Sequence, residues 1–355
     1  YIATIFRAPQ ACLTKRRSRG QPTMARLWGE LHGQPPKFVS GFSHARLQEM
    51  ATQEETTMGP VIDLEIGMPK TETAQRAAVI NRGRPGTPSS ESLPRPEGYG
   101  FDNYGHIFGA APPTPAGDND ASLATVVAEM DQANVEYGLL VNLPNDEIGQ
   151  AHRDYSGRFK IFPALNPTDG MRAVRELERL VREDGANGFR VASLYSALPA
   201  SDRRHYPLYA KCVELNIPVR IYTAMTYAND RPYELGHPRH LDDIAIDFPE
   251  LKIVAGLAGW PWINDMVGLL RRHPNLYCDT AAHRPRYLAK EGSGWEVFLQ
   301  YGNSLLQDKV MIGFSRYLFN CGYDELIAEY QHLPLKESVL EKWLYGNAAA
   351  FFGES

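Results

Sequence analysis

The chain has 355 residues, of which 43% are hydrophobic and 22% are charged, and its formal net charge is -5. This composition is that of a globular protein, long enough for one large barrel or two modest domains. The slightly acidic charge argues against nucleic acid as a partner. No run approaches the roughly 20 apolar residues that span a membrane. We therefore expect neither nucleic-acid binding nor membrane insertion.

The cysteines favour a reducing compartment. There are four of them, they are far apart and none forms a Cys-x-x-Cys pair: Cys12, Cys212, Cys278 and Cys321. This spacing does not match a zinc finger or a disulfide framework. We therefore predict a cytoplasmic location.

The first 57 residues differ from the rest of the chain. No acidic residue precedes Glu30, whereas six arginines and lysines do. We predict that residues 1–57 are a disordered tail, or translated sequence upstream of a true start at Met58. An organellar targeting segment has a similar composition and is the alternative.

Short β-branched runs alternate with amphipathic stretches from Pro60 onward. The first run, Val61–Ile66, predicts a strand. A proline- and glycine-rich segment follows from about 70 to 117, too long for a plain connector. It contains the aromatic stretch Tyr99–Phe108, which we expect to fold over another part of the protein. A helix is then predicted from an N-cap at Asp120.

The remaining elements repeat this alternation. Amphipathic helices are predicted at 171–181 and 206–215. Further strands are predicted at 138–143, 159–165, 188–192, 217–223, 252–257, 276–280 and 310–314. Continuously apolar strands separated by helices indicate a parallel sheet that is buried on both faces. Eight such units favour a closed (β/α)8 barrel, the TIM barrel, formed by residues 58–355.

A barrel of this type places its chemistry at the C-terminal ends of the strands. No glycine-rich nucleotide-binding motif occurs, which argues against an open nucleotide-binding sheet. The residues that end strands or follow them are Glu65, Asn142, Asn166, Arg190, Tyr222, Leu257, Asp279 and Ser315–Arg316.

Four short sequence motifs occur in order along the second half of the chain: Phe248–Val254, Pro261–Trp262, Pro274–Tyr277 and Gly346–Ala349. With them, residues 58–353 resemble the amidohydrolase superfamily. The resemblance is to the branch of aminocarboxymuconate-semialdehyde decarboxylase and related aromatic-acid decarboxylases, hydratases and lactonases. It implies an amidohydrolase-like barrel, a homodimer and a small-molecule carboxylate substrate.

The chain departs from this branch at the metal ligands. The branch opens with Asp-x-His-x-His, but here Glu65 and Gly67 stand in place of the histidines. Tyr222 and Leu257 replace the histidines that follow the fifth and sixth strands, and Arg316 replaces the aspartate after the eighth. A zinc-type site needs three or more imidazole, thiolate or carboxylate ligands. We therefore predict no bound metal and no other cofactor.

The polar replacements are the candidate site residues. We expect Glu65 and Arg316 to face each other at the barrel mouth, either as catalytic groups or as a salt bridge that fills the vacated space. Arg190 resembles the strand-four cation of lactonase-like members and offers a planar fork to a carboxylate. Catalytic roles are predicted for Glu65, Tyr222, His106, His283 and Arg316. Substrate binding is predicted for Arg190, Asn142, Asn166, Trp260, Tyr317 and Asp279.

These residues predict a metal-independent enzyme that acts on a small carboxylated aromatic or unsaturated compound. The reaction is a lyase step (decarboxylation or hydration/dehydration) or a lactone-type hydrolysis. One alternative is a non-catalytic relative that binds a ligand or a partner subunit. Another is a metal-dependent hydrolase with relocated ligands, which would be Glu65, His106, Asp279 and His283.

Overall fold

The computed structural model describes residues 59–67, 99–103 and 122–354. They all belong to one compact unit, Met58–Ser355. The predicted tail (1–57), most of the predicted long segment (about 70–117) and His106 lie outside the described residues. No helix within the described ranges has the length and apolarity needed to cross a membrane.

The described strands form a parallel barrel wall. They are β1 Val61–Gly67, β2 Val135–Val141, β3 Phe159–Ile161, β4 Phe189–Val191, β5 Val219–Tyr222, β6 Ile253–Gly256, β7 Leu276–Asp279 and β8 Val310–Met311. Hydrogen bonds order them β1-β2-β3 and β4-β5-β6-β7-β8. A parallel bridge between Ala164 and Arg190 joins β3 to β4. The Leu64 amide donates to the Ile312 carbonyl at 2.8 Å and joins β1 to β8.

The eight predicted strands are therefore all present. Most are shorter than predicted because regular pairing covers only part of each apolar run. The predicted strand 138–143 is displaced: β2 begins at Val135, which pairs with Val61, and ends at Val141.

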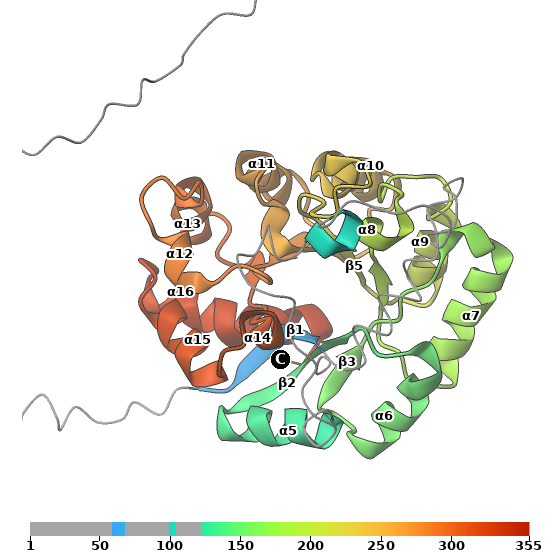
Figure 1. Cartoon of the computed structure of the whole chain (residues 1–355), viewed down its shortest axis with the longest axis horizontal. Coiled ribbons are helices and arrows are strands. Elements are labelled where there is room, and N and C mark those ends of the chain that lie inside the picture. Colours follow the sequence, from blue (N-terminus) through green and yellow to red (C-terminus); the bar gives the residue numbers. More distant parts are fainter. Residues whose placement is uncertain (1–58, 68–98, 104–121, 355) are drawn as a thin grey trace, which may run out of the picture. The chain divides into compact units, whose positions relative to one another are not determined.

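Helices surround this wall (Figure 1). They are α5 Leu123–Gln132, α6 Ile148–Asp154, α7 Met171–Arg182, α8 Ser193–Ser196, α9 Tyr206–Glu214, α10 Arg239–Asp247, α11 Ile263–Arg272, α12 Pro285–Leu288, α13 Glu296–Gly302, α14 Arg316–Phe319, α15 Tyr323–Gln331, α16 Glu337–Glu341 and α17 Asn347–Phe352. The prediction that Asp120 caps α5 is wrong. The N-cap is Ser122, whose hydroxyl accepts from the Thr125 amide at 3.2 Å.

Alternation along the strands separates two apolar layers. Inward-facing residues such as Leu64, Leu139 and Met311 form one core, and α17 adds Phe351 to it. The Tyr277 and Phe351 rings meet edge to face at 5.0 Å. The helix therefore closes the N-terminal end of the barrel with apolar side chains. Charged side chains that point inward are left for the opposite end.

Asp63 ties β1 to the segment that follows β8. It is fully buried, and its Oδ1 accepts from the Glu65 and Phe314 amides, both at 2.9 Å. Its Oδ2 accepts from the Tyr323 hydroxyl at 3.0 Å. The pairing register of β1 with β2 shifts between Asp63 and Ile66. Asp63 therefore fixes the backbone where Glu65, two residues further on, turns toward the barrel interior.

A short 3-10 helix, η1 Gly100–Asn103, belongs to the predicted aromatic stretch. Its Gly100 amide donates to Asn229 Oδ1 at 2.6 Å, and Asn103 Nδ2 donates to the Tyr227 carbonyl at 2.8 Å. The turquoise turn near β5 and α8 in Figure 1 is this helix. The described part of the stretch thus lies against the loop that follows β5, as the sequence led us to expect.

The pKa of Asp63 predicts a pH dependence of stability. Burial raises this pKa to about 6, although the Phe314, Glu65 and Tyr323 hydrogen bonds act to lower it. The folded state therefore binds this proton more tightly than the unfolded chain, whose aspartates titrate near pH 4. The carboxyl favours folding below about pH 4, and this contribution is lost as the pH rises through 6.

Asp63→Asn should remove this dependence. Because each pKa unit corresponds to about 1.4 kcal/mol, the wild type should lose about 3 kcal/mol of unfolding free energy relative to the variant between pH 4 and pH 7. Urea unfolding of both proteins across this range measures the difference. Parallel stability curves would contradict the buried-carboxyl explanation.

Candidate active site

A buried guanidinium occupies the C-terminal half of the barrel interior. Arg220, on β5, is 2% exposed. Its Nε donates to Asp279 Oδ2 on β7 at 2.6 Å, and its Nη2 lies 2.6 Å from Glu65 Oε2 on β1. Burial opposes the charge on Arg220, but the Asp279 and Glu65 carboxylates outweigh it and raise the pKa of the guanidinium. Three strands thus deliver one cation and two carboxylates to one point.

Two glycines make room for these side chains. A Cβ at Gly256 would lie 3.0 Å from Arg220 Cζ. A Cβ at Gly313 would lie 3.1 Å from Glu65 Cβ and 2.8 Å from Ala281 Cβ. The guanidinium therefore packs directly against the backbone of β6, where any other residue would crowd it.

Asp279 connects this charged centre to the loops at the mouth. It is fully buried, and its Oδ1 also accepts from the Leu257 amide at 3.0 Å and the Ala281 amide at 3.1 Å. These two hydrogen bonds hold the Asp279 carboxylate in the orientation in which it contacts Arg220. Leu257 itself has a φ of 70°, a left-handed conformation that is costly for a leucine. The hydrogen bond from its amide to Asp279 helps to hold it there.

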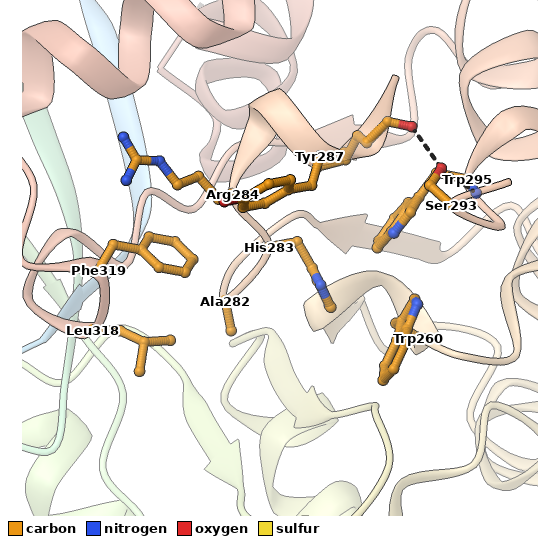
Figure 2. A pocket seen from close by; sticks show the side chains of 10 residues that line it. Trp260, Ala282, His283, Arg284, Tyr287, Ser293, Trp295, Leu318 and Phe319 are labelled. Carbon is orange, nitrogen blue, oxygen red and sulfur yellow. Dashed lines mark hydrogen bonds between the residues drawn. The ribbon is translucent and has the colours of Figure 1, made fainter. Parts of the chain in front are cut away.

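A cavity of about 450 Å³ lies among the loops at the C-terminal end of the barrel. Residues of the loops after β6, β7 and β8 line it, among them Trp260, His283, Arg284, Trp295 and Phe319. Figure 2 shows the His283 ring between the two indoles, with centroid distances of 4.7 Å to Trp295 and 6.1 Å to Trp260. The volume falls within the roughly 300–1,000 Å³ typical of small-molecule sites.

His283 is a polar residue of this cavity with a ring nitrogen that is not engaged in a hydrogen bond to the described residues. Its Nε2 is buried and has no hydrogen-bond partner among the described residues. A hydrogen bond links the ring to the Leu257 backbone. Burial lowers the pKa of His283 to about 4, although that hydrogen bond and the Asp279 charge raise it in part. The imidazole is therefore neutral at neutral pH.

Arg190 and Asn142 meet at the ends of β4 and β2. The Nη1 of Arg190 donates to Asn142 Oδ1, and Asn142 has a left-handed φ of 66°. Arg190 is also the register neighbour of Arg220 on the adjacent strand. No carboxylate of the described ranges forms an ion pair with Arg190. The structure therefore brings together two of the residues that the sequence predicts for substrate binding.

The expected pairing of Glu65 with Arg316 is wrong. Arg316 instead binds Glu129 on α5, with Nη1 on Oε2 and with Nη2 3.0 Å from Oε1. The Tyr317 hydroxyl donates to the same carboxylate at 2.8 Å. Ser315 adopts a left-handed φ of 49° and starts α14, which turns the arginine toward α5. Arg316 and Tyr317 thus form a separate cluster with Glu129.

Other predicted residues already have structural partners. The Tyr222 hydroxyl donates to the Met225 carbonyl at 2.7 Å, and burial raises the pKa of this phenol. Asn166 caps a 3-10 helix, η3 Pro167–Asp169, by accepting from the Thr168 amide at 3.0 Å. Asp279 holds Arg220, and Trp260 lines the cavity. Their roles in catalysis or substrate binding stay predictions.

Comparison with known proteins decides the family. A family model described as Amidohydrolase matches residues 109–353. The chain belongs to the amidohydrolase family. No curated protein matches the sequence.

Solved structures agree with the barrel fold of this amidohydrolase. An uncharacterized TIM-barrel protein from Bordetella bronchiseptica is 22% identical, with a TM-score of 0.62 over 83% of this chain and 99% of that one. The 5-carboxyvanillate decarboxylase LigW from Sphingomonas paucimobilis is 17% identical, with a TM-score of 0.59 over 84% of this chain and 100% of that one. The enzyme LigW2 from Novosphingobium aromaticivorans, solved with bound manganese, is 16% identical, with a TM-score of 0.57 over 83% and 97%. The predicted amidohydrolase-like (β/α)8 barrel is thereby confirmed.

The residues of this amidohydrolase do not fit a divalent metal at the position that its relatives use. Within the described ranges, no group of three or more His, Cys, Asp or Glu side chains could hold a metal ion. Glu65, at the first ligand position, already lies against the fixed positive charge of Arg220. The predicted alternative with relocated ligands gains no support, because Glu65, Asp279 and His283 form no such group and His106 lies outside the described residues.

Sequence reasoning missed Arg220 and Glu129. A signal for Arg220 was available: Val219 and Ile221 point to the helices, so strict alternation turns Arg220 inward with Tyr222. The resemblance to the family directed attention to Tyr222 alone. No comparable signal marks Glu129, which meets Arg316 across 187 residues of sequence.

Substitution at Gly256 tests the packing of Arg220. Gly256→Ala should push the guanidinium off Asp279 or Glu65 and lower the unfolding free energy by about 1–3 kcal/mol. The control is Gly268→Ala on α11, where a Cβ meets nothing within 4 Å. That change should leave stability unchanged or raise it by up to about 1 kcal/mol. Urea unfolding compares the two, and equal effects would contradict the close packing.

Proposed function

We propose that this amidohydrolase is an enzyme that acts, without a divalent metal at the family position, on a small carboxylated aromatic or unsaturated compound. The reaction is decarboxylation or hydration/dehydration, with lactone-type hydrolysis as the remaining member of the set. The fold neighbours support the substrate class, since one is a 5-carboxyvanillate decarboxylase and another was solved with a nitrobenzoic acid bound.

The observation that carries the proposal is the aromatic cavity around His283. The Nε2 of His283 is buried without a hydrogen-bond partner among the described residues, and burial keeps the imidazole neutral. A bound compound that presents a hydroxyl or another proton donor would satisfy this buried atom. The indoles of Trp260 and Trp295 supply flat apolar surfaces for an unsaturated or aromatic skeleton.

Arg190 is the proposed anion ligand. Its guanidinium keeps donors beyond the one that Asn142 uses, and it lies at the same end of the barrel as the cavity. Arg284 lines the cavity as well, but Glu329 and Glu325 already balance its charge. Arg190 is therefore the better partner for a substrate carboxylate.

Both proposed reactions require a group that moves a proton. In decarboxylation the bond to the carboxylate breaks, CO2 leaves, and the electron pair remains on a carbon that must then take up a proton. In hydration, water adds its oxygen to one carbon of a double bond and a proton goes to the next. His283 is the residue of the described cavity able to accept or return that proton.

A second candidate is a non-catalytic relative that binds the same kind of ligand. It is favoured by the mutual pairing of Glu65, Arg220 and Asp279, and by the bond of Tyr222 to a backbone carbonyl. Turnover separates the two candidates. The predicted homodimer and cytoplasmic location, drawn from the family resemblance and from the cysteines, stay predictions.

A ligand screen tests the proposal. Aromatic and unsaturated carboxylic acids should raise the melting temperature, whereas the matching carboxamides should not. Arg190→Ala should weaken acid binding about tenfold to a hundredfold because a charge-assisted contact is lost. His283→Ala should lower turnover of an active acid about a hundredfold or more while the protein still binds it.

Arg172→Ala is the matched control, since that side chain is 81% exposed on α7. It should leave binding and turnover unchanged. Binding without turnover would favour the non-catalytic candidate. If no acid stabilises the protein and Arg190→Ala changes nothing, the proposed substrate class is wrong.

A further inference from the structure

The charges at the barrel centre are unevenly distributed. Arg220 brings one positive charge, and Glu65 on β1 and Asp279 on β7 bring two carboxylates. The side chains are 3%, 19% and 0% exposed, respectively. Water is thus largely excluded from all three, and each depends on the others for its charge balance.

The charges of Glu65 and Arg220 depend on each other. A carboxylate stands at position 65, where relatives have an imidazole, and the guanidinium of Arg220 lies 2.6 Å from it. Without Arg220, Glu65 and Asp279 would be two buried carboxylates with no cation between them, which is strongly destabilising. Arg220 offsets one of the two negative charges, so one net negative charge remains among the three side chains.

We propose that Arg220 has taken over the charge-balancing place of the family metal, and that its guanidinium keeps divalent cations away from a latent site formed by Glu65 and Asp279. The guanidinium is permanently protonated and repels a second cation. Without it, two buried carboxylates remain. A bound cation would supply the positive charge that the two carboxylates then lack.

This inference does not depend on the proposed function, because it concerns ion binding and holds whether or not the protein turns over a substrate. Carboxylates are suitable ligands for manganese and magnesium, and such sites commonly keep several waters. Two carboxylates, one of them fixed by the Leu257 and Ala281 amides, therefore suffice for a site of moderate affinity.

Manganese binding to Arg220 variants tests the inference. Full-length wild type and Arg220→Ala are titrated with MnCl2, and free Mn²⁺ is followed by its EPR signal. The variant should bind one Mn²⁺ per chain with an affinity roughly tenfold or more above any wild-type binding. Mn²⁺ should also raise the melting temperature of the variant but not that of the wild type.

Two controls separate charge from shape. Arg220→Lys keeps a positive charge and should behave as the wild type does. The double variant Arg220→Ala, Glu65→Gln should lose the gained manganese binding. If Arg220→Ala is too unstable to purify, Arg220→Gln is titrated with MnCl2 in the same way. A second measurement compares the yield of each variant after refolding from urea with and without MnCl2.

The inference is overturned if neither neutral variant gains manganese binding or a manganese-dependent refolding yield. It is also overturned if the wild type binds one Mn²⁺ that Glu65→Gln abolishes. If the protein binds no carboxylic acid but Arg220→Ala gains a manganese site, the proposed function is wrong and this inference is supported.

Discussion

The ion pairs of Arg220 with Glu65 and Asp279 determine what the mouth of this barrel can do. Three strands meet through one guanidinium, and Gly256 leaves the space that it fills. Loss of one partner from such a buried pair costs about 3–5 kcal/mol, because the remaining charge has no solvent to receive it. The arrangement therefore constrains all three residues together, and it places a guanidinium beside Glu65.

The two ends of the barrel interior differ in polarity. Apolar side chains of the strands and of α17 fill the N-terminal end, so inward-facing charges gather at the other. There the Leu257 backbone links the two parts of the site. Its amide donates to Asp279, and its backbone also bonds His283 at the wall of the aromatic cavity. The charged centre is thus connected to the wall of the cavity through the Leu257 backbone.

The sequence predicted the barrel well because the apolar runs and helical periods are local signals. It also placed Arg190 and Asn142 at strand ends, and the structure joins them by a hydrogen bond. The charge pairing was harder to predict. The chain offers two arginines near the family ligand positions, and only the left-handed turn at Ser315 decides that Arg316 leaves the mouth for Glu129. Such tertiary choices depend on backbone geometry that no spacing of residues reveals.

The central claim is that a side-chain cation, not a metal ion, stands beside Glu65. Crystals of the wild-type protein grown with MnCl2, with diffraction recorded at the manganese absorption edge, test it most directly. We predict no anomalous density inside the barrel. The Arg220 guanidinium should contact the carboxylates of both Glu65 and Asp279. An anomalous peak coordinated by Glu65, with Arg220 displaced, would contradict it.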